Sequence, residues 1–259
     1  MKKLGNIVKR IAPGLFFLFL ILLWESVVRL FSLPTYLLPA PSLILQTLIQ
    51  RFPVLLTHLQ VTLYEAVVGL SAAVVVAMIL AAAMNRFILV KRLFYPLFVV
   101  SQTIPIIALA PLMMIWFGFG TFPKILIVIL VCFFPIVISM TEGLEAVDED
   151  LIDLMKVMGA TDSRIFFSVK LPSALPSIFA GMRISATYSV MGAVIGEWLG
   201  ANLGLGVFMI RAMNSYNTPS LFAAIVLVVL LSIGMFKMVD GAAWLLMPWN
   251  RSRSLLEKN

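Results

Sequence analysis

The 259-residue sequence is poor in the residues on which enzymes and metal sites depend. It has one cysteine, one histidine and only 12% charged residues. Cys132 alone cannot form an internal disulfide or a cysteine-based metal site, and His58 alone cannot supply a His-Glu-x-x-His motif. The sequence also lacks a Gly-x-x-x-x-Gly-Lys-Ser/Thr phosphate loop and a Gly-x-Ser-x-Gly turn. We therefore expect neither a membrane enzyme nor a chain that hydrolyses ATP itself, and we expect it to bind no metal or cofactor.

Apolar residues are abundant instead. They make up 62% of the sequence, whereas an ordinary soluble domain has roughly 45–50%. The apolar runs recur from end to end, and no polar block is long enough to fold separately, which predicts one domain in a lipid bilayer. The net charge is +7, but Lys and Arg stand in short clusters between apolar runs. That pattern is typical of membrane topology and argues against nucleic-acid binding.

A membrane-spanning helix needs about 20 mainly apolar residues, and six segments meet this requirement. Trp24 and Glu25 continue the first segment beyond a start that resembles a signal peptide, so we expect it to stay uncleaved. Pro105 and Pro111 interrupt the third segment. The sequence predicts an all-α integral membrane fold with spans at residues 11–31, 58–83, 95–117, 124–140, 176–198 and 220–246.

The basic residues predict the orientation, because Lys and Arg are enriched in cytoplasmic segments. With both termini in the cytoplasm, the outer segments hold only Arg29, Arg51, Lys124 and Arg211. The inner segments then hold Lys2, Lys3, Lys9, Arg10, Arg86, Lys91, Arg92, Lys156, Arg164, Lys170, Arg251, Arg253 and Lys258. On the outer side we expect an interfacial helix over residues 42–51 and a loop over residues 200–219.

The segment 141–175 is the only long polar stretch. Its apolar positions recur at spacings of three and four, which predicts an amphipathic helix, and Gly159 is placed to end it. A second short helix follows, capped by Thr161 or Ser163 and ending at Leu171-Pro172. The apolar positions of the first helix are Val147, Leu151, Leu154, Met155 and Met158. On these grounds alone, a surface hairpin resting its apolar side on its own bundle explains the pattern equally well.

The spacing within this hairpin carries a family resemblance. Asp153-Leu154-Met155, three residues, Gly159, nine residues, Val169, one residue and Leu171-Pro172 resemble the EAA loop of type I ABC importer permeases. The family's pattern is Glu-Ala-Ala, three residues, Gly, nine residues, Ile, one residue and Leu-Pro. Leu154 and Met155 depart from the two alanines, while the spacing is intact.

The resemblance implies that the hairpin contains a coupling helix that docks on a separate ATPase subunit, which would hold ATP and Mg. The residues that would make this contact are Asp153, Leu154, Met155, Met158, Gly159, Ala160, Leu171 and Pro172. It further implies a type I permease core over residues 58–245, with residues 1–57 and a cytoplasmic tail, 246–259, outside it. An extracytoplasmic substrate-binding protein, a homodimer and the inner or plasma membrane of a prokaryote are the remaining expectations.

Polar groups inside the spans are candidates for a substrate pathway, because they are costly in lipid. The candidates are Gln102, Thr103, Tyr188, Ser189 and Glu197. Helix-to-helix contacts explain the uncharged ones equally well, and an interfacial position explains Glu197. Glu65 also lacks a basic residue one turn away.

Two other pairs of charged residues are expected to be structural, because each pair lies one helical turn apart. They are Glu25 with Arg29 and Lys237 with Asp240.

The segment 186–206 resembles the permease group for nitrate, sulfonate, taurine and thiamine-precursor uptake. Within that group the likeness is greatest to permeases for pyrimidine precursors of thiamine, with riboflavin uptake as a neighbouring alternative. Gly192, Gly196 and Gly200 recur every four residues, a spacing that fits either a seam within the bundle or a dimer interface.

A secondary transporter that needs no ATPase is the alternative of a different class. It predicts charged or discontinuous helices near the midplane and no such hairpin.

Overall fold

The computed structural model describes residues 2–249, with side chains from Ala12 onward, and its described part is built of helices. In chain order they are α1 (Lys2–Leu30), α2 (Pro41–Gln50), α3 (Phe52–Arg86), α4 (Ile88–Ser101), α5 (Ile106–Phe117), α6 (Thr121–Glu145), α7 (Glu149–Val157), α8 (Asp162–Ile165), the π-helical turn η1 (Phe166–Lys170), α9 (Leu171–Trp198), α10 (Leu205–Asn214) and α11 (Thr218–Leu246). The sequence-based expectation of an all-α membrane fold is confirmed.

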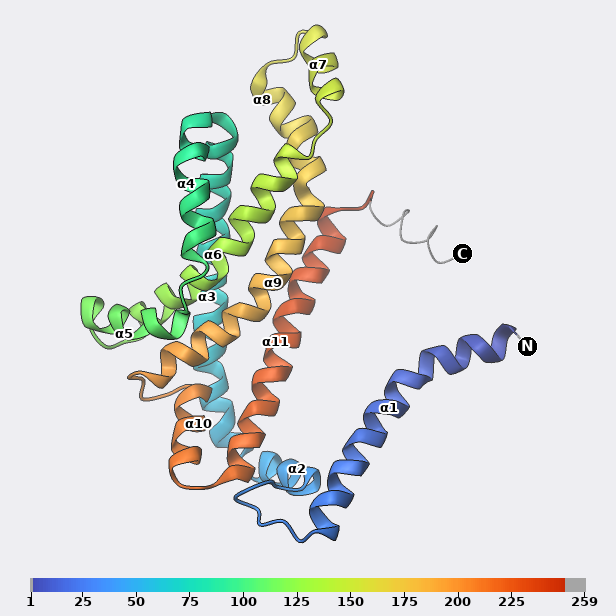
Figure 1. Ribbon diagram of the computed structural model, residues 1–259, viewed down its shortest axis with the longest axis vertical. Helices are drawn as coiled ribbons and strands as arrows, with labels where there is room; N and C mark the ends of the chain where they lie inside the picture. Colours follow the sequence, from blue (N-terminus) through green and yellow to red (C-terminus); the bar gives the residue numbers. More distant parts are fainter. Residues whose placement is uncertain (1, 250–259) are drawn as a thin grey trace.

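The core forms where α3, α6, α9 and α11 run side by side (Figure 1). Small residues let α6 and α9 approach closely: the Cα of Val128 lies 3.3 Å from where a Cβ on Gly192 would stand, and Lys124 is equally close to Gly196. These two glycines therefore belong to a seam within the bundle. Gly200 lies beyond α9 and faces Phe119.

Five helices are long and apolar enough to cross a membrane, and α4 with α5 forms a sixth span only if the pair is counted as one. The two helices meet at an angle of 106°, at a break before Pro105. Proline lacks the backbone N–H that would continue a helix, which explains the break. The third predicted span, 95–117, is therefore wrong as one straight helix. The described helices also extend beyond several other predicted spans.

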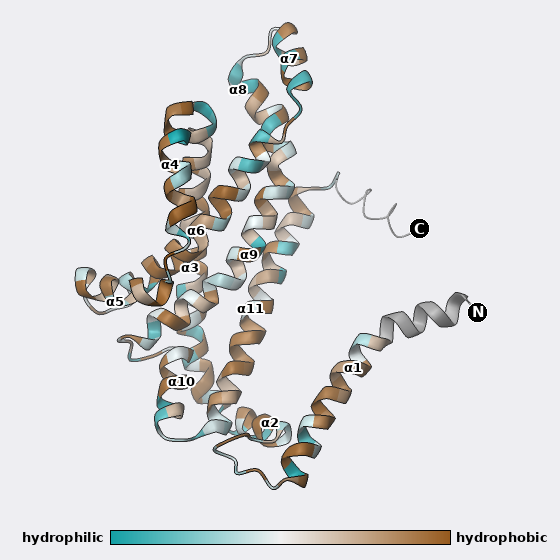
Figure 2. Ribbon diagram, viewed as in Figure 1, coloured by the Kyte–Doolittle hydropathy of each residue, from teal (hydrophilic) through white to brown (hydrophobic). Residues whose placement is uncertain are grey.

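Figure 1 separates the two ends of the bundle. The hairpin of α7 and α8 and the turn between α3 and α4 lie at one end, and α2 and α10 lie at the other. The helix predicted for residues 42–51 is present as α2, and its interfacial position stays a prediction, whereas the loop predicted over 200–219 contains the helix α10. In Figure 2 brown, apolar ribbon fills the middle of the spans, while teal gathers around α7 and α8.

α1 stands apart from the other spans and is connected to them through α2 (Figure 1). Glu25 and Arg29 form the predicted pair at 2.6 Å, and Glu25 also accepts hydrogen bonds from Ser42 at the start of α2. The predicted pair of Lys237 with Asp240 is not formed; Asp240 instead pairs with Arg183 of α9 at 3.0 Å. The basic clusters at 2–10 and 251–258, and most of the predicted tail, lie outside the described side chains.

Candidate functional site

The polar hairpin begins with the helix α7. The Asp148 side chain accepts a hydrogen bond from the backbone N–H of Asp150 at 3.0 Å and so caps the helix. Glu149 and Asp150 lie in the first turn and Lys156 in the last, the charge order that suits the helix dipole. Gly159 follows with a φ of +79°, a left-handed conformation that favours glycine. The sequence predicted this helix from its apolar spacing and its end from Gly159, but it did not identify the cap at Asp148.

Several apolar side chains on α7 and at its C-cap Met158 are exposed, whereas Ile152 and Met155 are partly buried. No residue of the helix is buried, and the exposed fractions of Leu154, Val157 and Met158 are 55%, 87% and 73%. Within the described chain the bundle therefore does not cover them, which weighs against a hairpin that packs on its own protein. An uncovered apolar surface on a polar hairpin is the feature expected of a contact site for another protein, and that role stays a prediction. Asp153 accepts a hydrogen bond from Lys156 at 2.9 Å, and this bond raises the pKa of Lys156 above its usual 10.5.

The second half of the hairpin does not end where the sequence suggested. Thr161, rather than Ser163, caps α8 by accepting a hydrogen bond from the backbone N–H of Arg164 at 3.4 Å. The chain then passes through η1 directly into α9. Leu171 and Pro172 are the first residues of α9 and follow the π-helical turn η1, so the helical path continues through a proline that has no N–H to donate. The predicted break at Leu171-Pro172 is therefore absent.

The base of the hairpin is tied to the neighbouring helix ends. Arg86 pairs with Asp162 at 2.9 Å, and Lys170 donates a hydrogen bond to Asn85 at 3.2 Å. A cavity of about 400 Å³ lies between these groups and Ile152 of α7. The second half of the hairpin, α8 and η1, is thus connected to the end of α3.

A second cavity lies at the break between α4 and α5 and is open on one side, since Gln102, Thr103 and Tyr188 in its wall are exposed. Its volume is about 380 Å³, and residues of α6 and α9 complete its wall. Gln102, Thr103 and Tyr188 all line it, which brings together three of the five residues predicted for a pathway. The discontinuity that the sequence analysis associated with a secondary transporter is thus present at this cavity.

The other two predicted pathway residues lie elsewhere. Ser189 is buried and bonds to the carbonyl of Ala186 within its own helix at 2.8 Å. Glu197 is 1% exposed and receives hydrogen bonds from Thr62 of α3 and from the backbone N–H of Gly206, both at 2.6 Å. Neither lines the cavity at the α4–α5 break. A pathway role for these two remains a prediction.

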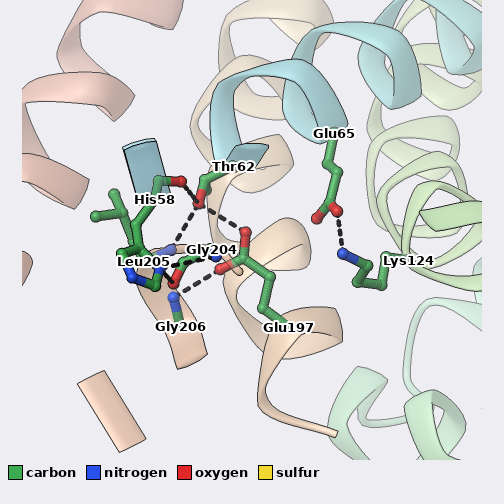
Figure 3. A network of polar contacts seen from close by, with 8 residues as sticks. All are labelled: His58, Thr62, Glu65, Lys124, Glu197, Gly204, Leu205 and Gly206. Carbon is green, nitrogen blue, oxygen red and sulfur yellow. Dashed lines mark hydrogen bonds and ion pairs between the residues drawn. The ribbon is translucent and has the colours of Figure 1, made fainter. Parts of the chain in front are cut away.

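Figure 3 shows the network around Glu197, which we call the outer cluster: His58, Thr62, Glu65, Lys124, Glu197, Gly204, Leu205 and Gly206. The first N–H groups of α10 are bonded to side chains of other helices: Gly204 donates to His58 at 3.0 Å and Leu205 to Thr62 at 2.9 Å. Helix termini need such partners when they are buried. The cluster therefore caps α10 on the bundle.

The outer cluster also contains an ion pair that the sequence did not reveal. Glu65 of α3 pairs with Lys124 of α6, and the two residues are 0% and 5% exposed. They are 59 positions apart, so no helical spacing could connect them. The sequence singled out Glu65 as an acidic residue in a span without a basic residue one turn away, and it placed Lys124 at the edge of an apolar run, but it did not connect the two.

Comparison with known proteins places this architecture in a family. The chain matches binding-protein-dependent transport system inner membrane components over residues 73–241. This match covers most of the helical core, including the cavity and the hairpin. The chain belongs to this family of ABC importer permeases, and it is a multi-pass inner-membrane protein.

Individual relatives differ in what their names say they transport. The formylaminopyrimidine transport permease ThiX of Halalkalibacterium halodurans is 39% identical over 242 residues, which cover 93% of this chain and 96% of the relative. The riboflavin permease RibX of Chloroflexus aurantiacus is 30% identical, covering 90% and 88%. The taurine permease TauC of Escherichia coli is 29% identical, covering 89% and 86%.

A solved structure confirms the fold. The MetNI methionine ABC transporter, in an inward-facing conformation, matches with a TM-score of 0.59 at 22% identity, covering 74% of this chain and 94% of the other. This likeness bears on the arrangement of the helices, not on the substrate. Membership in the family supports ABC permease over the alternative of an ATPase-independent transporter.

Proposed function

We propose that the chain forms the membrane pathway of an ABC importer for a pyrimidine precursor of thiamine. The observation that carries this proposal is the 39% identity to a formylaminopyrimidine permease along nearly the full length of both chains. The cavity at the α4–α5 break supplies a space of suitable size, since small-molecule sites occupy about 300–1,000 Å³.

Three partners complete the transporter in this proposal. A separate ATPase binds ATP and Mg and docks on α7, through the hairpin residues from Asp153 to Ala160. An extracytoplasmic binding protein delivers the substrate at the end of the bundle where α2 and α10 lie. A second copy of the chain supplies the other half of the pathway. Both chain termini then face the cytoplasm, on the side of the hairpin.

Reconstitution tests the proposal. The chain, its cognate ATPase and its cognate binding protein are placed in proteoliposomes, and ATP-dependent uptake of labelled formylaminopyrimidine is measured. Matched vesicles with an ATPase inactivated in its phosphate loop serve as the control. We expect uptake only with active ATPase and binding protein. Absence of pyrimidine uptake from an assembled, ATP-hydrolysing complex would reject the substrate assignment.

A second candidate substrate class is supported by the more distant relatives, whose names include sulfonate, taurine and riboflavin transport. Competition separates the candidates in the same vesicles. Excess unlabelled ethanesulfonate, taurine or riboflavin should leave pyrimidine uptake unchanged. Uptake of a labelled sulfonate in place of the pyrimidine would assign the chain to that second class.

A further inference from the structure

The residues that line the cavity at the break between α4 and α5 indicate the charge of the substrate that it can bind. We infer that this cavity is a substrate subsite for an uncharged, planar, polar heterocycle, and that it discriminates against anions. The inference rests on the proposed function, because it concerns the substrate of the same pathway. It adds the chemical class that the membrane subunit itself accepts and the residues that select it.

The wall of the cavity carries no charged residue. Its thirteen lining residues are apolar except for Ser101, Gln102, Thr103 and Tyr188, and these four are neutral. An anion bound against this wall would exchange part of its hydration for a surface that offers no cation, which is unfavourable. The basic residues in the neighbouring outer cluster and on α9 do not compensate, since Lys124 is paired with Glu65 and Arg183 with Asp240.

The neutral groups can instead bind a polar ring. Within the described chain, the amide of Gln102 and the hydroxyl of Tyr188 make no hydrogen bond to another residue, so their donors and acceptors are available to a ligand. An amide offers two donors and an acceptor, which suits the ring nitrogens and amino groups of a heterocycle. Thr103 donates to the carbonyl of Val100 at 2.7 Å and retains its acceptor capacity.

The apolar part of the wall suits a flat ligand. Phe134 and Tyr188 present aromatic rings to the cavity, and Met191 adds an adaptable thioether side chain. Pro105 and Pro135 also line the cavity. Aromatic side chains favour stacking on planar rings, whereas a small tetrahedral sulfonate gains little from them. Shape and charge therefore point to the same ligand class.

Matched substitutions test the polar groups. The cavity variants are Gln102→Leu, Thr103→Val and Tyr188→Phe, and the controls are Gln60→Leu, Thr187→Val and Tyr64→Phe, which change the same residue types at exposed positions outside the cavity. Loss of a hydrogen bond to a buried ligand should lower pyrimidine uptake by about tenfold for Gln102 or Tyr188. Equal uptake in the cavity variants and their controls would overturn the inference.

Opposite charges at one position test the charge class. Ser101 lines the cavity and is only partly exposed. If the ligand is neutral, Ser101→Asp and Ser101→Lys should reduce uptake to a similar extent, because each puts an unpaired charge beside it. If the ligand is an anion, Ser101→Lys should retain or raise uptake while Ser101→Asp abolishes it. This asymmetry would overturn the inference even if the uptake assay itself succeeds.

A binding readout keeps the inference testable if a charged variant fails to assemble. Ser101→Cys is nearly isosteric, and the native Cys132 is fully buried, so the introduced thiol can be labelled selectively in the assembled transporter. We expect formylaminopyrimidine to slow the labelling and ethanesulfonate to leave it unchanged. Protection by the sulfonate alone, or by neither compound, would contradict a neutral subsite. Because this measurement needs no transport, failure of the proposed function would be recognised separately, as absence of wild-type uptake.

Discussion

The hairpin at α7 and the outer cluster at α10 differ in which side chains they bury and which they expose. In α7 the apolar side chains Leu154 and Met158 are exposed, and the charged residues around them reach water. In the outer cluster the charged side chains Glu65 and Glu197 are buried, and each is bonded to a partner from another helix. Exposed apolar groups on a polar hairpin leave a surface that another protein could cover, whereas buried carboxyl groups bonded across helices hold the helices of the fold together.

We expect the largest loss of stability from a change in the buried ion pair of the outer cluster. Lys124→Met leaves the Glu65 carboxylate without its cation, and loss of one partner of a buried pair costs about 3–5 kcal/mol. We expect a clear fall in the unfolding temperature of the purified complex. By contrast, Arg86→Met removes the exposed pair with Asp162, in which both side chains are more than half exposed, and should cost under about 1 kcal/mol.

The double variant Glu65→Gln, Lys124→Met serves as the control for the ion pair. It removes both charges, so it should recover much of the stability that Lys124→Met loses. Equal destabilisation by the single and the double variant would show that packing, and not the unpaired charge, explains the loss.

Two glycines with positive φ provide the next comparison. Gly204 has a φ of +132° and Gly159 a φ of +79°, so an alanine is strained at both. A methyl group on Gly204 would also overlap the Glu197 carboxyl, whereas Gly159 has no atom within 4 Å of an added Cβ. Gly159→Ala should therefore cost about 1–2 kcal/mol, and Gly204→Ala clearly more. Thermal unfolding of the two variants checks the order, and a reversed order would refute the structural role given to the outer cluster.

The sequence predicted the hairpin better than the outer cluster, for a physical reason. A cap at Asp148, apolar residues at helical spacing and Gly159 all act within a few positions, so their pattern can be read locally. The bond between His58 and Gly204 joins residues 146 positions apart, and that between Thr62 and Glu197 joins residues 135 apart. Such contacts depend on how the helices pack, and one sequence contains no local sign of them.

The same contrast applies to the spans and the cavity. Long apolar runs identified the spans, and Pro105 indicated a disturbance in the third, but its 106° bend depends on tertiary structure. Gln102, Thr103 and Tyr188 were selected only as polar groups inside apolar runs, and packing brings them to one cavity. Ser189 was selected on the same grounds, although its hydroxyl bonds within its own helix. Polarity within an apolar run thus identifies candidate pathway residues. Only the arrangement of the helices shows which of them line the cavity.

The exposed side chains of α7 provide the third test. Leu154→Ala and Met158→Ala should weaken binding of the ATPase by about tenfold or more each, as truncation of an interface anchor does. The unfolding temperature should change little, because neither side chain is buried. Leu37→Ala, which alters an exposed leucine in the segment between α1 and α2, should leave ATPase binding unchanged. Co-purification and a binding titration with the cognate ATPase measure both effects.

The smallest expected effect concerns the charge on α7. The hydrogen bond from Lys156 to Asp153 raises the pKa of Lys156, so this lysine keeps its proton to a higher pH than an isolated one. Asp153→Asn removes the carboxylate and should lower that pKa towards the usual value.

Because only the neutral amine reacts with acylating reagents, Lys156 should be modified faster in the Asp153→Asn variant in the alkaline range. The stabilising contribution of the pair is present below the pKa of the unfolded chain and is lost only as the pH rises through the raised folded value, so near neutral pH the stability of the native protein should not vary with the protonation of Lys156. Mass spectrometry of the peptide containing Lys156 gives the rate, and the peptide containing Lys91, which pairs with Glu145 instead, is the internal control. Equal rates in the two proteins would mean that the contact with Asp153 is not maintained in solution. The side chains on the surface of α7 would then have no fixed arrangement in the free protein. Those of the outer cluster, by contrast, are held by bonds between helices.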